Sequence, residues 1–129
     1  MKVTYKLLLG FIFVTALAGC VRTAPILTPQ TTIITQNSAN QVKSAIFEAG
    51  QQRGWIMTPA GAGVINGRLA SRDYTANIRV NYSAKAYTIN YVSSTNLMAS
   101  SGSIHRNYNR WVNNLDKDIQ LQLAAKAFK

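Results

Sequence analysis

The sequence predicts an α+β fold in which a four-stranded antiparallel β-meander carries two helices on one face, in the order α-β-β-β-β-α. Two observations lead to this fold class. Apolar residues recur at steps of three and four in two separate stretches, which is the spacing of helices that cover a core on one side. Between those stretches lie short alternating runs, and the breaks that separate them suit hairpins but are too short for parallel crossovers.

The first predicted helix begins at Ser38, a residue type that caps helix starts, and ends near Gly50 and Gly54. Its apolar positions are Ala39, Val42, Ala45, Ile46 and Ala49. A second, longer helix is expected after the polar stretch 93–103. Its apolar stripe consists of Tyr108, Trp111, Val112, Leu115, Ile119 and Leu123.

Four strands are predicted between the helices, at residues 55–58, 64–71, 74–82 and 86–92. In the last two strands, alternation puts one set of apolar residues on a single face, which we expect to pack against the helices. This set consists of Ala76, Ile78, Val80, Tyr82, Tyr87, Ile89 and Tyr91.

The opposite face of the predicted sheet is polar and cationic. It carries Arg68, Asn77, Arg79, Asn81 and Asn90, joined by Asn66 and Thr88. One interpretation is an ordinary solvated sheet face. The other is a shallow platform for an anionic polymer or a partner protein, because arginine makes bidentate contacts with phosphate or carboxylate.

The start of the chain has the order of a secretory signal peptide. Two lysines, Lys2 and Lys6, precede an apolar run at residues 7–18, which is too short for a permanent membrane helix of roughly 20 residues. Residues 1–19 are therefore expected to be removed. Residues 20–37, rich in Thr, Gln and Pro, are expected to form a flexible tether. Residues 38–129 then form a single α+β periplasmic domain.

The motif Leu17-Ala18-Gly19-Cys20 resembles the lipobox of bacterial lipoproteins. The resemblance implies cleavage before Cys20 and acyl chains on that residue, which anchor the protein in a membrane. In lipoprotein sorting, an aspartate after the cysteine often retains a protein in the inner membrane, and here the residue is Val21. The resemblance therefore implies the outer membrane, with the protein lipid-anchored on the periplasmic face.

Composition favours a folded, basic protein. Hydrophobic residues make up 47% of the chain and charged residues 14%, which excludes a charge-driven disordered protein. Removing Lys2 and Lys6 with the signal leaves 12 basic and four acidic residues, a net charge of +8. Such a charge favours anionic partners, which in the periplasm are phosphates of lipids or lipopolysaccharide and carboxylates of peptidoglycan, and an envelope protein is also a possible partner. Nucleic acid is excluded by the compartment. The alternative interpretation is that the charge only keeps the protein soluble.

His105 is the only histidine, and Cys20 is the only cysteine. The folded part therefore lacks a typical set of metal ligands, and no metal or cofactor is expected. The nearest acids in sequence to His105 are Asp116 and Asp118, more than two helical turns away, so a capping or packing role is expected in place of catalysis. His105, Arg106 and Arg110 are also candidate binding residues, at an edge that Tyr108 and Trp111 either join or leave for the core.

Two segments, residues 82–91 and 104–115, resemble a family of small Gram-negative periplasmic lipoproteins that has no assigned activity. We therefore expect a non-enzymatic binding or assembly module of the cell envelope, without catalytic residues. Two alternatives stay open. One is a cell-wall-acting enzyme that uses His105. The other is a carrier of a small apolar ligand between sheet and helices, lined by Tyr82, Tyr87, Tyr91 and Trp111.

Overall fold

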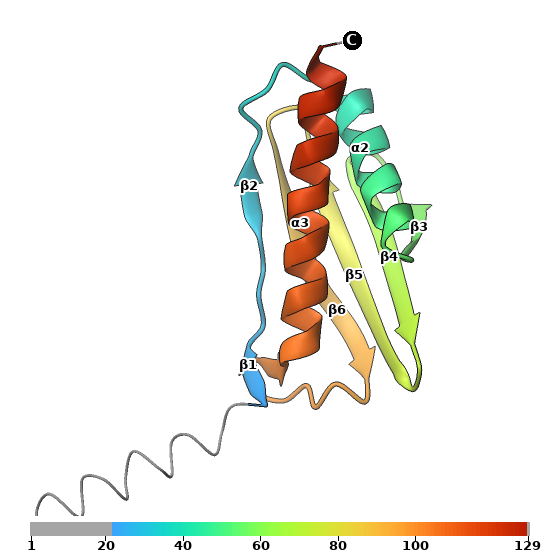
Figure 1. The fold of residues 1–129 in the computed structure, drawn as a ribbon, viewed down its shortest axis with the longest axis vertical. Coiled ribbons are helices and arrows are strands. Elements are labelled where there is room, and N and C mark those ends of the chain that lie inside the picture. The colour runs from blue at the N-terminus through green and yellow to red at the C-terminus, as the bar shows by residue number, and fades with distance from the viewer. Residues whose placement is uncertain (1–21, 129) are drawn as a thin grey trace, which may run out of the picture.

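The computed structural model describes residues 22–128 (Figure 1). They form two layers, a five-stranded antiparallel sheet and two helices that lie side by side on one of its faces. The elements in chain order are β1 (Thr23–Pro25), β2 (Gln30–Thr32), α2 (Ala39–Gln52), β3 (Ile56–Pro59), β4 (Val64–Ser71), β5 (Tyr74–Tyr82), β6 (Ala86–Thr95), β7 (Ser103–His105) and α3 (Arg106–Ala127). The sheet order is β2-β6-β5-β4-β3, and β1 pairs separately with β7. The predicted signal peptide and Cys20 lie outside the described residues.

The α+β class, the two helices and the antiparallel meander of β3 to β6 are confirmed, but the predicted number of strands is wrong. A fifth strand joins the sheet because Gln30–Thr32 pairs with the start of β6. Backbone hydrogen bonds extend this pairing beyond the strand. Ile89 N donates to Pro29 O at 3.0 Å, and Ile33 N donates to Lys85 O at 2.8 Å.

The described part of the predicted tether, residues 22–37, is folded against the rest of the protein. β1 places Thr23 opposite His105 of β7, and β2 lies along β6. Ile26 and Ile33 pack against the core. Burial of these apolar side chains and pairing of the backbone hydrogen-bonding groups together offset the conformational entropy that the segment loses when it is ordered. From residue 22 onward, the expectation of a free tether is therefore corrected.

Helix α2 begins as the sequence predicts. The hydroxyl oxygen of Ser38 accepts from Gln41 N at 3.1 Å, and Ser38 N donates to the Gln41 side chain at 3.0 Å, which makes a complete capping box. The helix ends where Gly54 adopts a φ of +85°, a conformation that glycine takes without strain. This turn leads directly from the helix into Trp55 and β3.

The core lies between the sheet and the helices. The predicted inward positions of β5 and β6 are buried or half-buried, as are the predicted stripes of both helices from Val42 onward. Two ion pairs join the helix layer at its surface, Arg53 with Asp118 at 2.6 Å and Lys126 with Glu48 at 2.9 Å. No helix within residues 22–128 is both long and apolar enough to cross a membrane.

Candidate functional site: the outer face of the sheet

The outer face of the sheet, opposite the helices, brings the predicted arginine and asparagine side chains together. The register aligns them in rows across β4, β5 and β6. Two neighbouring rows are Asn66, Arg79 and Asn90, and Arg68, Asn77 and Ser93. The predicted clustering of polar residues on this face is therefore confirmed by the strand register.

Hydrogen bonds between neighbouring strands fix several of these side chains. The pairs are Arg79 Nε to Asn66 Oδ1 at 3.2 Å, Asn77 Nδ2 to Ser93 Oγ at 3.0 Å, and Asn90 Nδ2 to Asn81 Oδ1 at 2.9 Å. Because Arg79 uses only Nε, its two terminal nitrogens have no protein partner in the part of the chain that the structure describes. Arg68 is exposed and likewise makes no side-chain hydrogen bond or ion pair there. Both guanidinium groups can therefore bind an external anion.

A shallow hollow of about 350 Å³ lies on this face. Its lining includes Arg68, Arg79 and Asn77, and exposed apolar residues border it. Ile56, at the edge strand, is 68% exposed, and Val92 is 44% exposed. Val92 stands where the register shifts, since Ile78 pairs with Tyr91 and the preceding residue, Asn77, pairs with Ser93. Strand alternation after the inward Tyr91 turns Val92 onto this face, and the β-bulge places the next residue, Ser93, on the same face opposite Asn77.

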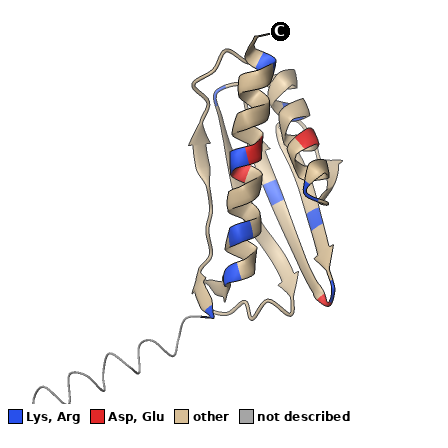
Figure 2. Ribbon diagram, in the orientation of Figure 1, with Lys and Arg blue, Asp and Glu red and all other residues tan. Residues whose placement is uncertain are grey.

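Acidic side chains are held away from this face. Glu48 and Asp118 form ion pairs within the helix layer, and Asp116 accepts hydrogen bonds from Thr31 and Tyr87 between the layers. The fourth acid, Asp73, lies in the turn between β4 and β5. In Figure 2 the bands of β4 and β5 are blue, and the red bands lie on the two helices and at the hairpin between β4 and β5. The positive charge of the outer face is thus not neutralised locally.

His105 caps α3, in agreement with the role expected from the sequence. Its Nδ1 accepts a hydrogen bond from Asn107 N at 3.1 Å, and its backbone pairs with Thr23 of β1. The described residues contain no group of three metal-ligating side chains. One imidazole nitrogen is therefore engaged in capping, and the chemistry that His105 offers is limited to the other.

The predicted cluster around Arg106 and Arg110 lies on α3, in the layer opposite the outer face. Both arginines are exposed, Tyr108 is fully buried, and Trp111 is half-buried. The structure therefore does not bring His105, Arg106 and Arg110 together with Arg68 and Arg79. Tyr108 is part of the core and is not available to a binding edge.

The space proposed for a small apolar ligand is occupied by the protein's own side chains. Tyr87 is 1% exposed, and its hydroxyl lies 3.1 Å from Asp116 O. The ring of Tyr91 packs edge-on against Tyr108, with centroids 5.5 Å apart. This packing favours a structural role for these tyrosines.

Trp111, one of the four residues expected to line an apolar ligand site, does line a hollow, which lies on the helix side of the molecule and also includes Trp55, a residue that the sequence did not indicate. Trp55 follows the glycine turn that ends α2, and Trp111 is on α3. In the sequence, Trp111 is surrounded by arginine and asparagine residues, which is a possible sign of a binding site. Its position in the apolar stripe of the last helix favoured the core instead.

No protein-family model matches this chain, and no curated protein is significantly similar to it.

Proposed function

We propose that this protein is an outer-membrane lipoprotein, held by acyl chains on Cys20, and that its sheet face binds an anionic polymer of the cell envelope without catalysing a reaction. The observation that carries the binding proposal is the pair Arg68 and Arg79, which lie on an open face with no acid among them. The lipobox-like motif carries the proposed anchor.

The geometry of the face favours an extended ligand. The hollow is open, and polar rows continue beyond it along three strands. Two arginines supply charge-assisted contacts to phosphate or carboxylate, and the asparagines supply both donors and acceptors. Phosphates of lipopolysaccharide and carboxylates of peptidoglycan meet this requirement in the proposed compartment.

In-cell crosslinking tests which molecule contacts the face. A photoreactive residue at Asn77 is expected to capture an envelope glycan, because Asn77 lines the hollow. The control position is Leu121, which is 69% exposed on α3, in the other layer. If the photoreactive residue at position 77, and not the one at position 121, captured one discrete protein, the ligand of this face would be a protein and not an anionic polymer. Absence of any product from Asn77 would mean that this face is ordinary solvated surface.

Charge reversal tests the two arginines directly. The double variant Arg68→Glu/Arg79→Glu is expected to bind purified lipopolysaccharide or peptidoglycan at least about tenfold more weakly, because each charge-assisted contact contributes about 1.5–3 kcal/mol. Salt should weaken binding of the unaltered protein, since exposed charges are screened. The measurement is cosedimentation at two salt concentrations.

A matched control has the same change in net charge on the other layer. Arg110→Glu/Lys117→Glu alters two exposed side chains of α3 and should retain most of the binding. Equal weakening in both double variants would show that only net charge matters, and the sheet face would then not be a specific site.

A further inference from the structure

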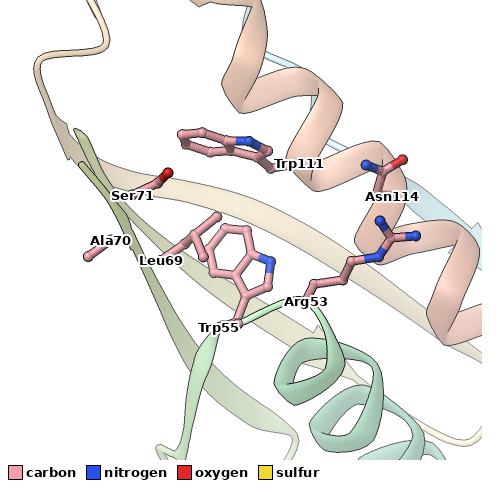
Figure 3. A pocket seen from close by; sticks show the side chains of 8 residues that line it. Arg53, Trp55, Leu69, Ala70, Ser71, Trp111 and Asn114 are labelled. Carbon is pink, nitrogen blue, oxygen red and sulfur yellow. The ribbon is translucent and has the colours of Figure 1, made fainter. Parts of the chain in front are cut away.

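The hollow on the helix side has a volume of about 410 Å³, within the range of small-ligand sites. It is open to solvent and is lined by three segments that are separate in sequence: the turn after α2, the end of β4 and the first half of α3. Figure 3 shows Trp111 on one side, Leu69 and Ser71 along β4, and Arg53 with Asn114 on the other side. The lining therefore combines aromatic surface with neutral polar groups.

The charge in this hollow is compensated, unlike that of the sheet face. Arg53 Nε donates to Asp118 Oδ2 at 2.6 Å, and this hydrogen bond, with the charge of Asp118, raises the pKa of Arg53. The remaining polar groups of the lining, including Ser71 and Asn114, are neutral. A neutral ligand is therefore favoured here over an anion.

Trp55 supplies a hydrogen-bond donor that lacks a partner. Its side chain is 2% exposed, and Nε1 makes no hydrogen bond within residues 22–128. In Figure 3 the nitrogen lies on the edge of the ring turned toward Arg53 and Asn114. A buried donor without an acceptor is energetically unfavourable. Nε1 is closed to water in this conformation, so an acceptor on a ligand in the hollow can reach it only when a neighbouring side chain of the lining moves.

We propose that this hollow binds a neutral saccharide, one or two sugar rings of a glycan. The C–H face of a sugar ring packs on the indole face of Trp111, as apolar groups do on aromatic surfaces. Its hydroxyl or acetamido oxygens then supply partners for Ser71 and Asn114 and, once a side chain of the lining moves, the acceptor for Trp55 Nε1. This site is separate from the sheet face and does not depend on the function proposed for Arg68 and Arg79.

The two tryptophans provide a direct measurement of binding. Both line the hollow, so the chain's entire tryptophan emission and both indole N–H resonances report on it. Titration of the purified full chain with tetra-N-acetylchitotetraose is expected to change the emission in a saturable way. The indole proton of Trp55 should move downfield as it gains an acceptor. Absence of both changes at millimolar concentrations of saccharide would overturn the proposal.

Variants separate binding from loss of folding. Trp111→Ala and, independently, Asn114→Ala should each weaken saccharide binding about tenfold while the circular dichroism spectrum is retained. Arg68→Gln/Arg79→Gln should leave the saccharide titration unchanged, whatever happens to anion binding. If that sheet-face variant lost saccharide binding and Trp111→Ala kept it, the saccharide site would not be this hollow.

Discussion

Replacing Cys20 with serine is expected to abolish acylation of this protein completely. Each buried methylene of an acyl chain contributes about 0.8 kcal/mol, so the proposed anchor is the largest single energy that holds the protein at a membrane. Cys20 is the only cysteine, and therefore no other thiol can take the lipid. The measurement is metabolic labelling with a palmitate analogue, together with the mass of the product. The mass should show residues 1–19 still attached.

Two control variants complete this test. Val21→Asp should keep the label and move the protein toward the inner-membrane fraction, as lipoprotein sorting implies. Exchange of residues 1–20 for an ordinary cleavable secretory signal should release the folded protein in soluble form. Continued labelling of Cys20→Ser would contradict the proposed anchor.

The position of β1 gives the proposed anchor a geometric consequence. The strand begins at Thr23, three residues after Cys20, and an extended chain spans about 3.3–3.6 Å per residue. An acylated Cys20 would thus hold the folded part within roughly 10 Å of the lipid headgroups. Ligands of the sheet face are therefore expected near the membrane.

The parts of the fold that the sequence predicted best are those with a local periodicity. The boundaries of Val64–Ser71 and Tyr74–Tyr82 agree with the prediction, because alternation over eight or nine residues is strong and turn residues bound both ends. The same alternation predicted that Arg68 and Arg79 lie on the outer face of the sheet. The same period puts Val92 on that face, but it does not predict Ser93 there, because a β-bulge interrupts the alternation between Tyr91 and Ser93.

The parts that the sequence did not predict depend on distant pairing. β1 and β2 have three residues each, and the partner of β1, β7, is about 80 residues away in the chain. Prolines at 25 and 29 also suggested a loop. That both tryptophans line one hollow was not predicted for a similar reason, because Trp55 and Trp111 meet only after α3 packs beside the end of α2. No local pattern indicates such a contact.

The second large expected effect is unfolding at alkaline pH, caused by two buried tyrosines. Burial, together with the hydrogen bond to Asp116, raises the pKa of Tyr87, and burial beside Tyr91 raises the pKa of Tyr108. Below about pH 10 both phenols are protonated in the folded and unfolded states, so stability is complete. Above it the unfolded chain loses protons that the folded state retains. The free energy of unfolding should therefore fall by about 1.4 kcal/mol per pH unit for each tyrosine.

Two phenylalanine substitutions form a matched pair for this prediction, because each removes one hydroxyl and reduces the alkaline slope by about 1.4 kcal/mol per pH unit. At neutral pH their effects should have opposite signs. Tyr87→Phe removes the donor to Asp116 and should lower the free energy of unfolding by about 1–3 kcal/mol. The hydroxyl of Tyr108 is buried and has no partner within the described residues. Tyr108→Phe should therefore raise the free energy of unfolding at neutral pH by about 1 kcal/mol. Urea unfolding across this pH range measures both quantities, and equal destabilisation by the two variants would mean that Tyr108 has a partner.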